Sequence, residues 1–183
     1  MPDSDEHLID QFRVHGRREC LEELLRRHLA SVRGLVFQMV LDDDAADDVT
    51  QDIFVRVVRG IDHFEGRSEF STWLFRIAMN TVHSHLSKHG HTRLQFHSDL
   101  PDYTTASHMP PDGAVLQAEL TTEIQAALSR LTPPLRAAIV LVCLQSRAAA
   151  DAAEIEGCST QTMYWRVHEG RRHLKKLLAE HLQ

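Results

Sequence analysis

Apolar residues recur at spacings of three and four through most of this sequence, and this spacing is typical of amphipathic helices. Alternating apolar and polar runs, which would indicate strands, are scarce, and so are the Asn-Gly and Asp-Gly pairs that close hairpins. The pattern therefore predicts an all-α protein. Gly16 interrupts the first apolar stretch and is expected to separate two helices.

The composition changes abruptly at residues 98–113, which read SDLPDYTTASHMPPDG and include three prolines and a glycine. Such a segment carries too little apolar surface to order itself. We therefore expect a flexible linker at 98–113 that joins two small helical domains, residues 1–97 and 114–183. A chain of 183 residues is long enough for both domains to bury a core.

An acidic stretch at residues 42–52 leads into another helix of the first domain. Asp44 is a candidate N-cap for this helix, because a short carboxylate can accept from the free N–H groups of the first turn. Val49, Ile53 and Val57 fall on one helical face and are expected in the core.

Further helix starts are indicated by polar residues that precede apolar runs. Ser71 or Thr72 can cap the helix that follows, and Thr132 can cap a helix with Pro133 at its first position, where the missing N–H costs nothing. The apolar run at 135–144 predicts one continuous, largely buried helix.

The C-terminal region predicts a helix-turn-helix, in which a helix over 147–156 is followed by a short glycine turn and a helix over about 160–178. Residues 159–178 carry five Lys or Arg side chains and one carboxylate, in a chain whose net charge is −6. Met163 and Val167 should pack inward. The outward positions are Gln161, Tyr164, Trp165, His168 and Arg172. This face suits base edges and phosphates, although cations at a helix end can also simply complement its dipole.

Residues 46–82 contain a D-x-x-Q-[DE]-x-F motif and an F-x-T-W-L-[FY]-R-I-A motif. With these motifs the segment resembles the second conserved region of the extracytoplasmic-function (group 4) sigma factors of the sigma-70 family. Residues 128–177 resemble their fourth region, in the same order and after a linker. The resemblance covers nearly the whole chain. It implies an RNA polymerase sigma factor that directs promoter-specific initiation by recognising −10 and −35 elements.

The resemblance also implies which side chains meet the polymerase. Asp48, Gln51 and Asp52 match the family residues that dock on clamp helices of the largest catalytic subunit. Carboxylates can pair there with exposed arginines and steer assembly. A solvated acidic face is the alternative interpretation of the same three residues.

Residues 70–98 contain no carboxylate, which suits a groove for a melted DNA strand because negative charge would repel phosphate. Asn80 matches a family position that contacts the unstacked −10 base, and its amide can bond a Watson–Crick edge. The other candidates for this channel are Arg76, His83, Ser84 and Lys88. Trp73 is expected inside the domain rather than stacked on DNA.

By the same resemblance, the last helix reads the −35 duplex. Tyr164, Trp165, His168 and Glu169 occupy base-contacting positions, and the acceptor at Glu169 favours a cytosine amino group. The remaining candidates are Ser159 as N-cap, Gln161 and Arg172 on the outward face, and Arg166, Arg171 and Lys175 as phosphate contacts.

Other functional classes are disfavoured. The sequence has no phosphate-binding glycine loop, no G-x-S-x-G and no H-E-x-x-H, so we expect no enzyme. The thirteen histidines and three cysteines lack compact zinc-site spacings, so we expect neither a metal nor a cofactor. The longest apolar run has eight residues and no signal peptide is evident, which predicts a cytoplasmic protein without membrane insertion.

Several partners and alternatives remain open. The resemblance implies core RNA polymerase, promoter DNA and an anti-sigma factor as partners. A helix-turn-helix regulator that acts without polymerase is one alternative function. A sigma-like adaptor that does not bind DNA is the other.

Overall fold

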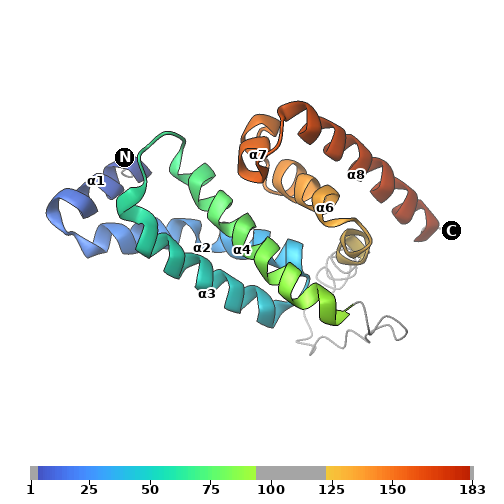
Figure 1. The fold of residues 1–183 in the computed structure, drawn as a ribbon, viewed down its shortest axis with the longest axis horizontal. Helices are drawn as coiled ribbons and strands as arrows, with labels where there is room; N and C mark the ends of the chain where they lie inside the picture. Colours follow the sequence, from blue (N-terminus) through green and yellow to red (C-terminus); the bar gives the residue numbers. More distant parts are fainter. Residues whose placement is uncertain (1–3, 94–122, 182–183) are drawn as a thin grey trace, which may run out of the picture.

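The computed structural model describes residues 4–93 and 123–181, here called the N-terminal half and the C-terminal half (Figure 1). The elements are α1 (Asp5–His15), α2 (Arg18–Val40), α3 (Asp43–Gly60), a 3-10 turn η1 (Ile61–His63), α4 (Phe70–Arg93), a helix over 123–129, α6 (Pro133–Ile139), a π-helical segment η2 (Val140–Leu144), α7 (Ala149–Glu156) and α8 (Thr160–His181). Neither described half contains a strand, which confirms the all-α prediction. The predicted linker at 98–113 lies outside the described residues.

Gly16 ends the first helix as predicted. Its φ of 64° is left-handed, a conformation that glycine adopts without a steric penalty, and its N–H donates to the carbonyl of Phe12. At the other end of α1, the Ser4 hydroxyl accepts from the N–H of His7. The chain can therefore reverse direction between α1 and α2.

Two predicted helix caps are wrong. The N-cap of α3 is Asp42, not Asp44, because the extended backbone of Asp42 lets its carboxylate accept from the N–H of Ala45 at 2.8 Å. Helix α4 begins at Phe70, so Ser71 and Thr72 lie within its first turn. The N–H groups of Thr72 and Trp73 donate to the carbonyl of Glu69, the residue before the helix.

The N-terminal half packs α2, α3 and α4 around a common core. Val49, Ile53 and Val57 are buried on α3, as the spacing predicted. Trp73 lies against Phe64, with ring centroids 5.3 Å apart, and is partly buried within the domain as expected.

The C-terminal half departs from the predicted continuous helix at 135–144. Thr132 and Pro133 begin α6 as expected, but the helix widens into the π-helical segment η2, where the N–H of Gln145 bonds the carbonyl of Val140. Immediately after this wider turn, the Gln145 side chain bonds Ser31 and Gln38 of α2. The irregularity therefore lies where the two halves meet.

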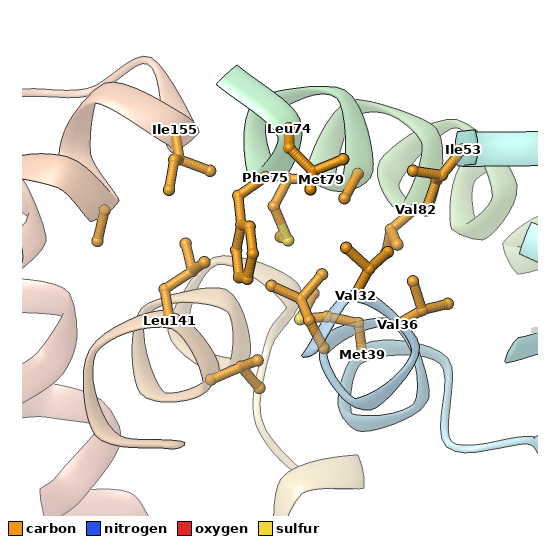
Figure 2. Close-up of a cluster of buried hydrophobic side chains, with 14 of the residues drawn as sticks. Val32, Val36, Met39, Ile53, Leu74, Phe75, Met79, Val82, Leu141 and Ile155 are labelled. Atoms are coloured by element: carbon orange, nitrogen blue, oxygen red, sulfur yellow. The ribbon is translucent and has the colours of Figure 1, made fainter. Parts of the chain in front are cut away.

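The two halves share one hydrophobic core. Figure 2 shows Phe75 and Met79 of α4 facing Leu141 of η2 and Ile155 of α7, with α2 completing the cluster. All four of these side chains are at most 3% exposed. We call this contact, together with the polar pairs between α4 and α7, the seam.

Arg136 of α6 adds a polar connection near the seam. Its guanidinium donates to the carbonyls of Leu128 and Ser129 at 2.9 Å, which lie at the end of the preceding helix. It also donates to the carbonyl of Met39 in α2 at 2.8 Å. One side chain thus satisfies carbonyl groups from both halves, and helix ends require such partners.

Replacing either of two helical glycines with alanine should change the free energy of unfolding, and in opposite directions. A Cβ at Gly170 of α8 would lie 2.7 Å from Cγ1 of the buried Ile139, whereas at Gly34 of α2 the nearest atom is 3.9 Å away. We expect Gly34→Ala to raise the free energy of unfolding by about 0.5–1 kcal/mol through helix propensity. Gly170→Ala should lower it by about 1–3 kcal/mol through overpacking. Urea denaturation of both variants tests this, and a gain for both would contradict the close approach of α8 to α6.

Candidate nucleic-acid interface

The C-terminal helix-turn-helix has the predicted form. Helix α7 ends at Glu156 and is capped by Gly157, whose left-handed φ of 63° lets its N–H bond the preceding turn. The Ser159 hydroxyl then accepts from the N–H of Thr162 at 3.1 Å and caps α8. The turn is therefore short and held at both helix ends.

The outward face of α8 is exposed as the sequence predicted. Tyr164 and Trp165 are 64% and 61% exposed, which is unusual for large aromatic side chains. Met163 and Val167 are buried on the opposite side. The other members of the predicted face, which are Gln161, His168 and Arg172, are also exposed, and so is Lys175, a predicted phosphate contact. This surface combines flat apolar area, hydrogen-bonding groups and positive charge, the chemistry that recognises base edges and phosphates.

Glu169 is held by its neighbours on α8. Its carboxylate bonds the guanidinium of Arg172 and lies 3.1 Å from Nε2 of His173. The hydrogen bond from Arg172 is the main cause of the lowered pKa of Glu169. A cytosine amino group would therefore compete with two donors already in place.

Two arginines of α8 have guanidinium groups in contact with other parts of the protein, although Arg171 is itself exposed. Arg166 is turned toward α7, with a nitrogen 3.7 Å from the Glu156 carboxylate and 3.8 Å from the Cys158 sulfur. Arg171 lies against the sulfur of Cys143 at 3.4 Å. Both were predicted as phosphate contacts, and in this structure their guanidinium groups have protein partners.

The second candidate surface is one side of α4. Asn80, Ser84 and Lys88 are exposed there, and the Ser84 hydroxyl donates to the carbonyl of Asn80 at 2.8 Å. Arg76 and His83 lie on the same helix but face α7. Arg76 bonds Glu154 at 2.5 Å, and Nε2 of His83 lies 3.0 Å from a Glu156 oxygen. The five predicted −10 residues are thus divided between solvent and the seam.

The environment of His83 favours its protonated form. The hydrogen bond with Glu156 raises the pKa of His83, and the negative charge of Glu156 acts in the same direction. Partial burial and the positive charge of Arg166 oppose that rise. The Glu156 side chain is only 6% exposed, so its carboxylate is largely satisfied by these two cations.

The stability of the protein should depend on pH through this pair. Because the pKa of His83 is raised in the folded state, the pair contributes fully below about pH 6.5, and the contribution is lost as the pH rises through the raised pKa. We expect His83→Gln to destabilise the protein more at pH 6 than at pH 9, measured by urea denaturation. Glu156→Gln should abolish this pH-dependent difference. Parallel pH profiles for wild type and His83→Gln would contradict the assignment.

The acidic residues of α3 form a separate exposed face. Asp48, Gln51 and Asp52 are all exposed; Asp52 pairs with Arg56 at 3.0 Å. Asp48 has no ion-pair partner among the residues that the structure describes. The face therefore presents at least one carboxylate that is available to another molecule.

An apolar groove lies beside this acidic face, and the sequence reasoning missed it. Its volume is about 660 Å³, and its lining includes Leu29 of α2 together with Phe54, Val55 and Val58 of α3. Leu29, Val55 and Val58 are 41–48% exposed. Val55 and Val58 fall outside the core stripe of α3, and these surplus apolar residues were the signal that could have revealed the groove.

Two further properties concern metals and membranes. In the described halves, no three His, Cys, Asp or Glu side chains come close enough together to hold a metal ion. No helix within residues 4–93 or 123–181 is long and apolar enough to cross a membrane.

Comparison with known proteins identifies the family. The Sigma-70 region 2 family matches residues 24–92, and the Sigma-70, region 4 family matches residues 121–174. The chain is 30% identical over 177 residues to the ECF RNA polymerase sigma-E factor of Haemophilus influenzae. The aligned residues cover 91% of this chain and 93% of that protein. It is 29% identical to the ECF RNA polymerase sigma factor SigE of Mycolicibacterium smegmatis, of which it spans 62%.

A solved structure gives the same result at the level of the fold. The sigma factor RpoE of Bartonella quintana, crystallised with the anti-sigma factor NepR, aligns with a TM-score of 0.71 and 28% identity, over 87% of this chain and 96% of that one. The two family matches lie in the order region 2, region 4 along this chain, and the relative of 30% identity covers most of it. This chain belongs to the extracytoplasmic-function (ECF) family of RNA polymerase sigma factors.

Proposed function

We propose that this sigma factor binds core RNA polymerase through α3 and directs it to promoters by contacting the −35 duplex with α8 and the −10 strand with α4. The proposal depends chiefly on the exposed aromatic and basic face of α8, because a folded protein rarely leaves two adjacent aromatic residues in solvent without a use. The protein acts by binding rather than by catalysis, and it acts in the cytoplasm, where polymerase and promoters are found.

Different kinds of side chain on the exposed face of α8 support the −35 contact. Tyr164 and Trp165 offer apolar edges that suit thymine methyl groups, while Gln161 can bond adenine. Arg172 and Lys175 are exposed and can neutralise phosphates, which position the helix without specifying sequence. Since Glu169 is engaged by Arg172 and His173, we expect it to contribute less to base selection than its position implies.

The −10 contact is supported by the charge pattern of α4. Residues 70–98 contain no carboxylate, and Asn80 and Lys88 are exposed on α4. An exposed amide can bond the edge of an unstacked base, and a lysine can follow the backbone of a single strand. Carboxylates on this side of the helix would repel the strand.

The polymerase contact combines charge with apolar area. Asp48 and Asp52 can pair with basic residues of the polymerase clamp, and the adjoining groove can receive an apolar side chain of the same partner. Interfaces of this kind place an apolar centre inside a polar rim. Because RpoE of Bartonella quintana was solved with an anti-sigma factor, we also propose that this chain has an anti-sigma partner.

Reconstituted transcription tests the proposed function. Core polymerase without sigma factors is mixed with the full chain and a library of random promoters, and transcribed templates are sequenced. We expect transcripts only when the chain is present, from templates that share a −35 and a −10 element. Binding to a DNA duplex without polymerase, and no transcription with it, would instead favour a helix-turn-helix regulator. Polymerase binding without template selection would favour an adaptor.

A further inference from the structure

Glu169 and Arg172 form a bidentate ion pair on the exposed face of α8. Oε2 of Glu169 accepts from Nε of Arg172 at 3.1 Å, and Oε1 accepts from Nη2. Nε2 of His173 also lies 3.1 Å from Oε1. The Glu169 side chain is only 20% exposed. Both oxygens of this carboxylate therefore have partners on α8 itself.

The pair leaves one edge of the Arg172 guanidinium available. A guanidinium has two edges that can each donate two parallel hydrogen bonds, and Glu169 takes the edge formed by Nε and Nη2. The other edge, formed by Nη1 and the outer N–H of Nη2, belongs to a side chain that is 67% exposed. Because the group is planar, two bonds to the first edge fix the direction in which the second edge points.

The same pair determines where this edge lies along the helix. Helical side chains lean toward the N-terminus, and the bonds to Glu169 hold the guanidinium over the turn that precedes Arg172. Trp165, which is 61% exposed, lies four residues before Glu169 and so on the same stripe of α8. The donors of Arg172 therefore join the surface around Trp165.

We propose that Arg172 recognises a guanine of the −35 duplex through this edge, and that Glu169 is a positioning residue that orients it. The inference deepens the proposed −35 contact of α8 and rests on it. In the major groove, O6 and N7 of guanine accept two parallel hydrogen bonds from one guanidinium. The carboxylate also offsets the charge of Arg172, so the pair attracts phosphate less than Arg172 alone would.

Reconstituted holoenzyme tests this assignment. Templates carry the −10 element that the wild-type holoenzyme selects and a randomised −35 region, and sequencing of the transcribed templates gives the base preference at each position. The variants are Arg172→Ala, Arg172→Lys and Glu169→Ala, with Lys175→Ala as the control at an exposed cation of the same helix. Lysine keeps the charge but lacks the two-donor edge. Alanine is favourable within a helix, so the fold should stay intact.

We expect the wild type to prefer guanine at one −35 position by about 10- to 100-fold. Arg172→Ala and Arg172→Lys should both reduce that preference to within about twofold and leave the other positions unchanged. Glu169→Ala should reduce it about fivefold, because the donor is no longer held in one direction. Lys175→Ala should weaken transcription from all templates alike and keep every base preference.

Three results would overturn the assignment. A guanine preference that survives in Arg172→Lys would show that Arg172 supplies charge alone. A base preference lost in Glu169→Ala but kept in Arg172→Ala would show that the carboxylate contacts the base itself. A selected −35 element with no guanine preference that depends on Arg172 would leave the pair without this role. The proposed function is judged separately, because it fails only if wild-type holoenzyme does not select and transcribe promoters.

Discussion

Replacing Phe75 with alanine should lower the free energy of unfolding by about 3–5 kcal/mol, the largest loss of stability that we expect from one substitution. The Phe75 ring is fully buried between α4 and η2, and Arg147 stacks on its face (Figure 2). Its removal leaves a cavity that borders both halves and takes away the surface on which Arg147 rests. Neither half can collapse into that space without disturbing the other.

Urea denaturation measures this loss, and the two tryptophans report on the two halves. Trp73 lies in the N-terminal half and Trp165 in the C-terminal half, so single-tryptophan variants follow each one. We expect the transitions of both halves to shift together in Phe75→Ala, because they share this core. Val58→Ala, at an exposed position, serves as the control and should change the free energy by less than about 0.5 kcal/mol. A similar small change for Phe75→Ala would show that the seam is not formed in solution.

Asp48→Arg should weaken binding to core polymerase by about 100-fold. The substitution places a positive charge where the proposed interface offers a carboxylate to basic residues, and like charges brought together cost several kcal/mol. The fold should tolerate it, because Asp48 is exposed and an arginine there lies four residues before Asp52, a spacing that permits a stabilising ion pair.

Sedimentation of the purified chain with core polymerase measures this effect. The matched control is Asp10→Arg, which makes the same charge change at an exposed position on α1 and should alter affinity by less than about threefold. Equal weakening by both variants would indicate a general effect of net charge. Unchanged binding by Asp48→Arg would remove α3 from the polymerase interface.

These two experiments test the contact between the halves and the polymerase contact independently. Phe75→Ala examines whether the halves associate, and Asp48→Arg examines whether the acidic face binds polymerase. In the structure Asp48 is accessible while Arg76 is engaged by Glu154.

Much of the local structure was predictable because helical burial is recorded in the spacing of apolar residues. Val49, Ile53 and Val57 were assigned to the core of α3, and Met163 and Val167 to the inner face of α8, from the period of 3.6 alone. The same period predicted that Tyr164 and Trp165 point outward. The two sequence motifs and the order of the regions predicted the family.

The details at helix ends were less predictable, since several residues near a boundary have similar capping chemistry. Asp42 and Asp44 can both accept from a first-turn N–H, and the backbone conformation of Asp42 decided between them. Likewise, the run at 135–144 has the composition of a regular helix. Its π-helical part, η2, lies against α2, and such long-range contacts leave no periodic trace in the sequence.

The sequence by itself determined the helices, their inner and outer faces and the membership of the sigma family, because these depend on neighbouring residues and on short motifs. Only the tertiary structure decided which charges meet. Arg76, His83 and Arg166 read as free cations for DNA, and nothing in their local sequence pairs them with Glu154 and Glu156, which come from a different helix. Electrostatic pairing depends on distance in space, and the packing of Phe75 against Leu141 and Ile155 sets that distance.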